Sequence, residues 1–86
     1  MSSATPVTDH GKIRKWVEKN NGRPASVKGT GKGNDPGMLR IDFDEKEETL
    51  DELDWDTWFK WFDKNELALL MSDESRFNKL VSRKAH

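Results

Sequence analysis

The stretch DWDTWFKWFDKNELALLM, residues 54–71, decides the fold, because it joins a strongly amphipathic segment to a short apolar one. At about 100° per residue, several aromatic side chains fall on one face of a helix: Trp55, Trp58, Phe59 and Phe62. Asp54 is a suitable N-terminal cap, since its carboxylate can accept the free N–H groups of the first turn, and Asn65 is suited to end the helix. Residues 67–71 are then typical of a buried strand that follows the helix.

Three Trp residues recur at a spacing of three in this helix: Trp55, Trp58 and Trp61. Large aromatic side chains bury about 150–250 Å² each, so we expect Trp55 and Trp58 to build the core of so small a domain. Trp61 falls at the margin of the aromatic face. Its position fits either the edge of the core or an exposed surface that contacts a partner, and both interpretations stay open.

Upstream of this stretch, apolar residues at helical spacing predict a first helix over residues 9–20: Ile13, Trp16 and Val17. Thr8 or Asp9 can cap its start, and Gly22 suits the left-handed position just past a helix end. Residues 1–8 show no such pattern, and we expect them to form a disordered tail.

Two short strands are expected between the helices. Residues 25–28 and 39–43 alternate apolar and polar side chains, and residues 29–37 between them are dense in Gly and other turn formers. This pattern predicts a β-hairpin with a long, mobile loop. Residues 76–82 can pair with the strand at 67–71 or form a short helix, and the pattern leaves both open.

The sequence therefore predicts the α+β class, with the order α-β-β-α-β and a final β if residues 76–82 are extended. We expect a small antiparallel sheet of three or four strands, packed by two helices. A chain of 86 residues fits one domain. We place that domain at residues 9–83, followed by a disordered C-terminal tail at residues 84–86.

Composition excludes several classes of protein. The chain has no Cys, which excludes a disulfide framework and a thiolate zinc site. Its first residues lack the basic and apolar regions of a secretory signal, and the longest apolar run, residues 67–71, is too short to span a bilayer. We therefore expect a cytoplasmic protein that makes no membrane contact.

The net charge of −1 hides an uneven distribution. Residues 1–40 carry eight Lys or Arg against three Asp or Glu, residues 41–66 carry three against eleven, and residues 67–86 carry four against two. Such a bipolar chain is not a uniform polyanion binder. The simplest interpretation is that the basic and acidic blocks face each other within the fold.

No motif in the chain matches a catalytic or cofactor site. The glycine-rich loop at 29–37 lacks the Walker order, because Lys32 is followed by Gly instead of Ser or Thr, and by a strand instead of a helix. An EF-hand loop that begins at Asp42 would need Gly and Glu where the chain has Glu47 and Leu53. There is also no Cys nucleophile and no Ser in a Gly-x-Ser-x-Gly elbow. We expect a protein that is not an enzyme and that holds no cofactor or metal.

Four stretches resemble a family of small bacterial proteins of similar length: IRKWVEKNNGRPASVKGTG, LRIDF, LDWDTWFKWFDKNELALLMSD and SRFNKLVSR. The resemblance covers residues 9–83, and many members carry the name 1,4-alpha-glucan branching enzyme. Branching enzymes are built around a (β/α)8 barrel of about 250 residues, so a chain of 86 residues cannot hold one. The resemblance implies no known activity and assigns no site residue. Relatives carry a Pro-Gly-Tyr-Ser-Gly-like insert where this chain has residues 44–47, which implies that the acidic segment is a variable loop.

We expect the chain to be a non-catalytic binding or adaptor module that contacts another protein. Its candidate partner surface consists of Trp61, Lys28, Lys32, Arg14 and Lys15. One alternative is nucleic-acid binding through the basic N-terminal half: Arg14, Lys15, Lys19, Arg23, Lys28 and Lys32. The other alternative is glycan binding by the Trp series, which requires exposed and coplanar indoles.

Overall fold

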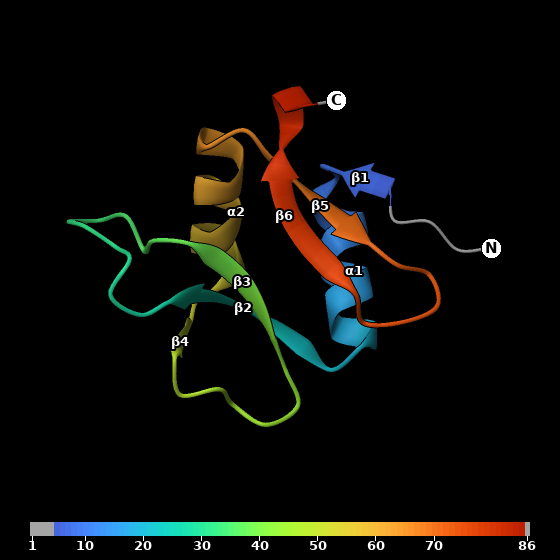
Figure 1. Cartoon of the computed structure of the whole chain (residues 1–86), viewed down its shortest axis with the longest axis horizontal. Helices are drawn as coiled ribbons and strands as arrows, with labels where there is room; N and C mark the ends of the chain where they lie inside the picture. Colours follow the sequence, from blue (N-terminus) through green and yellow to red (C-terminus); the bar gives the residue numbers. More distant parts are fainter. Residues whose placement is uncertain (1–4, 86) are drawn as a thin grey trace.

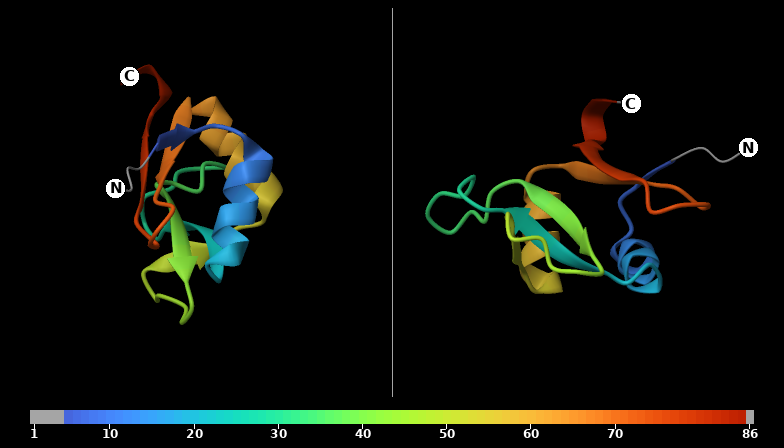
Figure 2. Two further views of the ribbon diagram at one scale, coloured as in Figure 1. Left: turned by 90° about the vertical axis from the view of Figure 1, so that its right-hand side faces the viewer. Right: turned by 60° about the horizontal axis from the view of Figure 1, so that its bottom comes forward.

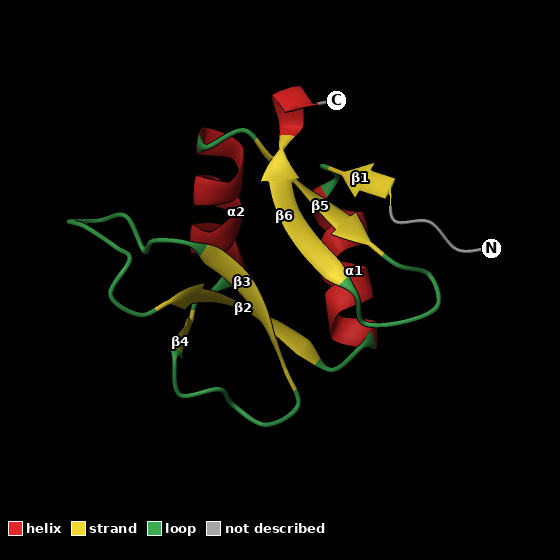
Figure 3. Ribbon diagram, in the orientation of Figure 1, coloured by secondary structure: helices red, strands yellow, loops and turns green. Residues whose placement is uncertain are grey.

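A computed structural model describes residues 5–85 of the chain, and Figure 1 shows the arrangement of its helices and strands. In chain order, the elements are β1 (Thr5–Val7), α1 (His10–Lys19), β2 (Gly22–Val27), β3 (Leu39–Phe43), β4 (Leu50–Glu52), α2 (Trp55–Lys64), β5 (Leu67–Met71), β6 (Asn78–Ser82) and the 3-10 helix η1 (Arg83–Ala85). The α+β class and the two expected helices are confirmed (Figure 3). No helix within these residues has both the length and the apolar character needed to cross a membrane.

The strands form two antiparallel sheets, where the sequence suggests one. The first sheet has the order β1-β5-β6, and the second sheet has the order β3-β2-β4. In the first sheet Leu69 lies opposite Leu80. In the second sheet Pro24 lies opposite Ile41, which confirms the predicted hairpin of β2 and β3. Figure 2 shows the two sheets as separate layers, with α1 beneath the first sheet and α2 against the second.

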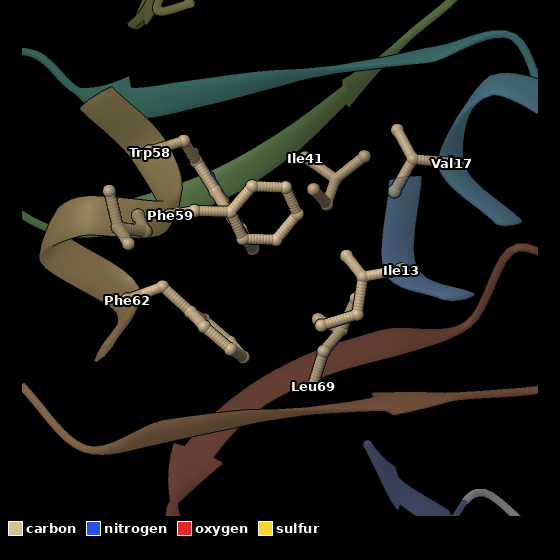
Figure 4. Packing of buried hydrophobic residues seen from close by; sticks show 8 residues of the cluster. Ile13, Val17, Ile41, Trp58, Phe59, Phe62 and Leu69 are labelled. Carbon is tan, nitrogen blue, oxygen red and sulfur yellow. The ribbon is translucent and has the colours of Figure 1, made fainter. Parts of the chain in front are cut away.

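The core lies between the two sheets and the two helices, and its centre is the aromatic face of α2. Trp58 and Phe62 are fully buried, and their rings stack with a centroid distance of 5.1 Å. Figure 4 shows the α2 rings directed towards aliphatic side chains of α1, β3 and β5: Ile13, Val17, Ile41 and Leu69. The expected burial of Trp58 is confirmed, and Trp55 lies half-buried at the edge of the same cluster.

Both helices begin at caps that the sequence predicts. Asp9 accepts a hydrogen bond from the backbone N–H three residues further on, at 3.0 Å, and Asp54 accepts the equivalent bond at 2.6 Å. Each carboxylate thereby satisfies a donor that the first helical turn would otherwise leave free. The helix boundaries therefore follow from local sequence.

The end of α1 differs from the expected form. Asn21, not Gly22, takes the left-handed conformation, with a φ of 60°. Gly22 serves a close approach instead, because a Cβ at this position would come within 3.0 Å of Val17 and Ile41. The missing side chain lets β2 start directly beneath the last turn of α1.

Two segments that the sequence predicts to be disordered form regular structure. Residues 5–7 form β1, because their backbone pairs with the neighbouring strand β5 and Val7 packs against the core. Residues 83–85 form η1, which takes in most of the predicted C-terminal tail. Residues 1–4 and His86, which complete the two predicted tails, lie outside the described part of the chain.

The structure also decides the second half of the chain. The segment over residues 76–82 contains the strand β6, which pairs with β5, so the extended alternative is the correct one. The acidic stretch before α2 contains β4, which the sequence does not predict. Leu50 anchors this strand opposite Val27 of β2 and is 5% exposed.

One ion pair joins the two sheets at their outer edges. Arg76, just before β6, pairs with Asp44, just after β3, and the guanidinium also lies 5.4 Å from the ring centroid of Phe43. Within residues 5–85, no backbone hydrogen bond connects one sheet to the other. Side-chain packing in the core therefore sets how the sheets sit against each other.

The packing predicts a sharp contrast between neighbouring leucines of β5. Leu69→Ala should lower the free energy of unfolding by about 2–5 kcal/mol, because it opens a cavity in the centre of the core. Leu70→Ala, a change on the opposite, half-buried face of the strand, is the matched control and should cost less than half as much. Urea unfolding followed by Trp fluorescence measures both, and equal losses would contradict this account of the core.

Candidate functional site

A cavity of about 440 Å³ lies where the two sheets meet, beside the end of α2. This volume falls in the range of about 300–1,000 Å³ that is common for ligand sites. Apolar side chains from the start of β3 and from β5 and β6 line it: Met38, Leu39, Leu67 and Leu80. Polar side chains complete the lining: Thr30, Asp35, Arg40 and Asn65. We call this the inter-sheet cavity.

The loop between β2 and β3 forms one wall of the inter-sheet cavity and is bonded within itself. Lys32 and Asp35 exchange two backbone hydrogen bonds of 3.0 Å, and the Asp35 carboxylate accepts from the N–H of Gly37 at 2.8 Å. The Thr30 hydroxyl accepts from the N–H of Met38 at 2.9 Å. Gly37 has a φ of 100°, and a Cβ there would lie 2.1 Å from the Thr30 hydroxyl, so the turn requires glycine. The loop that the sequence predicts to be mobile thus has a defined internal geometry.

Met38 stands at the mouth of the inter-sheet cavity and is 55% exposed. Among the described residues, Phe77 in the β5–β6 turn is the other large hydrophobic side chain left this open, also at 55%. A Met side chain has three rotatable bonds and a polarizable sulfur, so it adapts to the shape of a bound group. Met38 therefore adds exposed apolar surface to the lining of the cavity.

The wall at the end of α2 is fixed by a chain of polar contacts. The Arg83 guanidinium donates to the backbone carbonyl of Leu67 at 2.8 Å and to the carboxylate of Asp63 at 2.9 Å. Asp63 also contacts Nε2 of His10 at 2.8 Å, and the His10 ring stacks on Phe59. Partial burial raises the pKa of the Asp63 carboxyl, but the Arg83 hydrogen bond and the His10 contact outweigh it, so that pKa lies below its ordinary value.

Arg40 differs from the other arginines of the chain. Within the described residues, no carboxylate lies within 4.0 Å of its guanidinium, whereas every other arginine forms an ion pair: Arg14, Arg23, Arg76 and Arg83. The Arg40 backbone is held firmly, because its carbonyl accepts from the indole N–H of the buried Trp58 at 3.2 Å. Arg40 thus combines a fixed backbone, a guanidinium that is unpaired among the described residues and a place in the lining of the inter-sheet cavity.

The polar side chains of the inter-sheet cavity differ in whether hydrogen bonds of their own loop already engage them. Thr30 and Asp35 are engaged by backbone N–H groups of their own loop. Over residues 5–85, no three His, Cys, Asp or Glu side chains are grouped so that they could hold a metal ion. Besides its apolar surface, the cavity lining holds two further polar residues, Arg40 and Asn65.

A second, shallower groove of about 280 Å³ runs along α1. Three lysines on one face of the helix border it, together with the half-buried Trp16 and Met71: Lys12, Lys15 and Lys19. The Trp16 ring is fixed, because its indole N–H donates to the backbone carbonyl of Ser72 at 2.9 Å. This α1 groove combines positive charge with an aromatic side chain.

The structure does not gather the predicted partner surface into one place. Arg14 and Lys15 lie on α1, and Arg14 pairs with Glu18, whereas Lys28 and Lys32 lie in the β2–β3 loop. Figures 1 and 2 show this loop and α1 at opposite ends of the molecule. The two basic groups therefore cannot contact the same short ligand.

Trp61 lies at the edge of the core instead of forming an open patch. It is half-buried against the core, one helical turn before the cavity residue Asn65, and the ammonium of Lys64 lies 4.6 Å from its ring centroid. Most of the Trp61 side chain is therefore covered, which agrees with a position at the edge of the core. The Trp series gives no ladder for a sugar, because Trp58 is fully buried and the ring of Trp55 stands at 80° to it.

Sequence reasoning missed Met38 and Arg40, although one signal was available. Residues 39–43 alternate apolar and polar side chains, which predicts that Arg40 lies on the exposed face of the strand. What the pattern cannot give is the position of β6, whose Leu80 supplies the facing wall of the cavity. A cavity between two sheets depends on their relative placement, which no local pattern encodes.

The carboxyl groups with lowered pKa predict how acid destabilises the fold. Hydrogen bonds from Arg76 and Thr57 hold the pKa values of Asp44 and Asp54 below the ordinary 3.8, and Asp63 behaves likewise. Because the folded pKa is the lower one, these groups contribute stability that is complete above the ordinary value and is lost as pH falls through the folded values. The urea midpoint should therefore hold between about pH 5 and 7 and drop steeply below about pH 4.

The variant Asp63→Asn separates the contribution of Asp63 to the pH dependence of stability from the contributions of the other carboxyl groups. This variant should lower the urea midpoint at pH 6 and flatten part of the drop below pH 4, since the group that titrates is gone. Glu45→Gln, in the exposed loop after β3, is the control and should leave the profile unchanged. A profile of Asp63→Asn that runs parallel to the wild type down to pH 2 would contradict the assignment.

Comparison with known proteins gives no information on the inter-sheet cavity or the α1 groove. The chain matches no protein-family model, and neither the search of curated proteins nor the search of solved structures found a match.

Proposed function

We propose that the protein is a non-catalytic binding module that contacts another protein through the inter-sheet cavity. The observation that carries this proposal is Met38, a large apolar side chain that is 55% exposed at the mouth of a cavity lined by three leucines. Protein interfaces concentrate their binding energy in such places, where an anchor side chain enters a pocket and is fully desolvated.

The size of the effect can be bounded from Met38 itself. Full burial of a Met side chain contributes about 1.5–3 kcal/mol, and roughly half of this side chain remains to be covered. Covering it contributes about 1 kcal/mol, which corresponds to a factor of about five in affinity. The three leucines add to this only where a partner side chain reaches into the cavity.

Selection of peptides from a random displayed library against the whole chain tests this proposal. Enriched peptides should bind Met38→Ala at least about fivefold more weakly than the wild type, because the anchor surface at the cavity mouth is lost. Phe77→Ala is a matched control, since Phe77 has the same exposed fraction but lies in the β5–β6 turn. Peptides that depend on Phe77, or on neither residue, would show that the inter-sheet cavity is not the binding site.

A second candidate function is the binding of a nucleic acid along the α1 groove. The observation in its favour is the placement of Lys12, Lys15 and Lys19 beside Trp16, which combines phosphate contacts with a ring. The remaining basic residues of the N-terminal half do not join this surface. Arg23 lies 3.6 Å from Asp42, and Lys28 lies 3.8 Å from Asp51.

The salt dependence of binding tests this second candidate. A fluorescent single-stranded oligonucleotide should bind in about 50 mM salt, with a log–log slope against salt of roughly −0.7 per phosphate neutralised. Lys15→Gln should reduce the slope by about that amount, because it removes one phosphate contact from the α1 groove. Lys79→Gln, on β6, should change nothing. Absence of binding at this salt concentration would remove the candidate.

A further inference from the structure

We infer that the partner enters the inter-sheet cavity as an extended segment, which adds a strand between β3 and β6 and sets a carboxylate against Arg40. The inference rests on the proposed function and specifies the chemistry of the partner. Three features of the described residues carry it: the free edge of β3, the free edge of β6, and Arg40, a residue of the cavity lining whose guanidinium has no carboxylate within 4.0 Å.

β3 is an edge strand whose outer backbone groups point away from its neighbour. It pairs with β2 alone, and the N–H of Val27 donates to the carbonyl of Met38 at 2.8 Å, which makes these two a hydrogen-bonded pair. Hydrogen-bonded pairs alternate along an antiparallel ladder. The N–H and C=O groups of Leu39, Ile41 and Phe43 therefore point to the free edge.

β6 presents the same kind of edge from the other sheet. The N–H of Ser72 donates to the carbonyl of Phe77 at 3.1 Å, and the N–H of Arg83 donates to the carbonyl of Glu66 at 2.7 Å. These bonds show which residues of β6 form hydrogen-bonded pairs with β5. The same alternation leaves the backbone groups of three residues on the free edge: Asn78, Leu80 and Ser82. Leu80 and Leu39 both line the cavity, so the two edges flank it.

An extended peptide is the ligand that fits two free strand edges. Strand addition satisfies a row of backbone donors and acceptors, while pockets along the edge select alternate side chains. The inter-sheet cavity lies at such a position, because its apolar lining begins at Met38 and continues through Leu39 to Leu80. An apolar side chain of the peptide would fill it.

The charge of the cavity selects a carboxylate as the polar group of the partner. Arg40 is exposed and unpaired among the described residues, and a guanidinium binds a carboxylate through two parallel hydrogen bonds. Asp35, the acidic residue of the lining, is engaged by the N–H of Gly37. The partner segment should therefore carry Asp or Glu near an apolar residue.

The peptides selected against the whole chain are the probes for this inference. Those that depend on Met38 should be enriched in Asp or Glu at a fixed spacing from an apolar residue. The tightest one, synthesised with blocked ends, should bind Arg40→Gln about tenfold or more weakly than the wild type. The same peptide with its Glu replaced by Gln should show an equal loss of affinity for the wild-type protein. Its affinity for Arg40→Gln should fall little further, because the charge pair is already broken. Arg14→Gln is the matched control, because Arg14 is an exposed arginine on α1 far from the cavity.

Backbone measurements test the added strand separately from the charge. Binding should slow hydrogen exchange at the amides of Leu39, Ile41 and Leu80, which point to the free edges. Peptides N-methylated at the alternate residues whose N–H groups face β3 should lose the hydrogen bonds to β3, and peptides N-methylated in the other register should lose those to β6. Both sets should therefore bind more weakly than the unmethylated peptide. Equal urea midpoints of Arg40→Gln and the wild type show that the variant folds.

The outcomes separate this inference from the proposed function. Peptides that depend on Met38 but ignore Arg40→Gln, with no slowed exchange at Leu39 and Ile41, overturn the inference and leave the proposed function in place. An absence of peptides that depend on Met38 overturns both. Concentration-dependent dimerisation that Met38→Ala abolishes would identify a second copy of the chain as the occupant, and this also overturns the inference.

Discussion

The burial of the α2 aromatic face between two unconnected sheets is the constraint on which the rest of this structure depends. Trp58 and Phe62 occupy the centre of the core, and no backbone ladder links the sheets within residues 5–85. In a single sheet, hydrogen bonds would fix the spacing of neighbouring strands at about 4.8 Å. Here the packing of the α2 rings sets the separation, and the inter-sheet cavity lies beside the C-terminal end of the helix, where Asn65 borders it.

The uneven charge of the sequence finds a physical role within this arrangement. Basic residues of the N-terminal block meet acidic residues of the central block across the second sheet, as when Arg23 contacts Asp42 and Glu52 and Lys28 contacts Asp51. The exposed pair of Lys28 and Asp51 contributes little free energy. The Asp42 carboxylate is buried, so its contact with Arg23 offsets part of the cost of removing that charge from water. Arg40 belongs to the same basic block and has no carboxylate partner among residues 5–85, so its guanidinium is available to a ligand.

The sequence could predict those features of the fold that depend on residues close together in the chain, such as the starts of the helices. Asp9 and Asp54 mark helix starts because a cap and the N–H that it accepts lie three residues apart. β1 and β4 escaped prediction because three-residue strands have no detectable period and form only where a neighbour supplies the pairing. For the same reason the inter-sheet cavity was out of reach, since Leu39 and Leu80 face each other only after both sheets have formed. Of the predicted partner surface, Lys32 lies in the loop that forms one wall of the cavity, where its backbone bonds to Asp35 of the lining.

The Arg76–Asp44 pair has a mechanical consequence for the gap between the sheets. It connects them where β3 ends and β6 begins, whereas the inter-sheet cavity lies towards the opposite end of β3. The two sheets are thus tethered at one extremity and held elsewhere by side-chain contacts alone. A small rotation about that tether would widen the opposite extremity while every ladder bond of either sheet stays intact. An opening that widens in this way admits ligands of different size while both sheets stay folded.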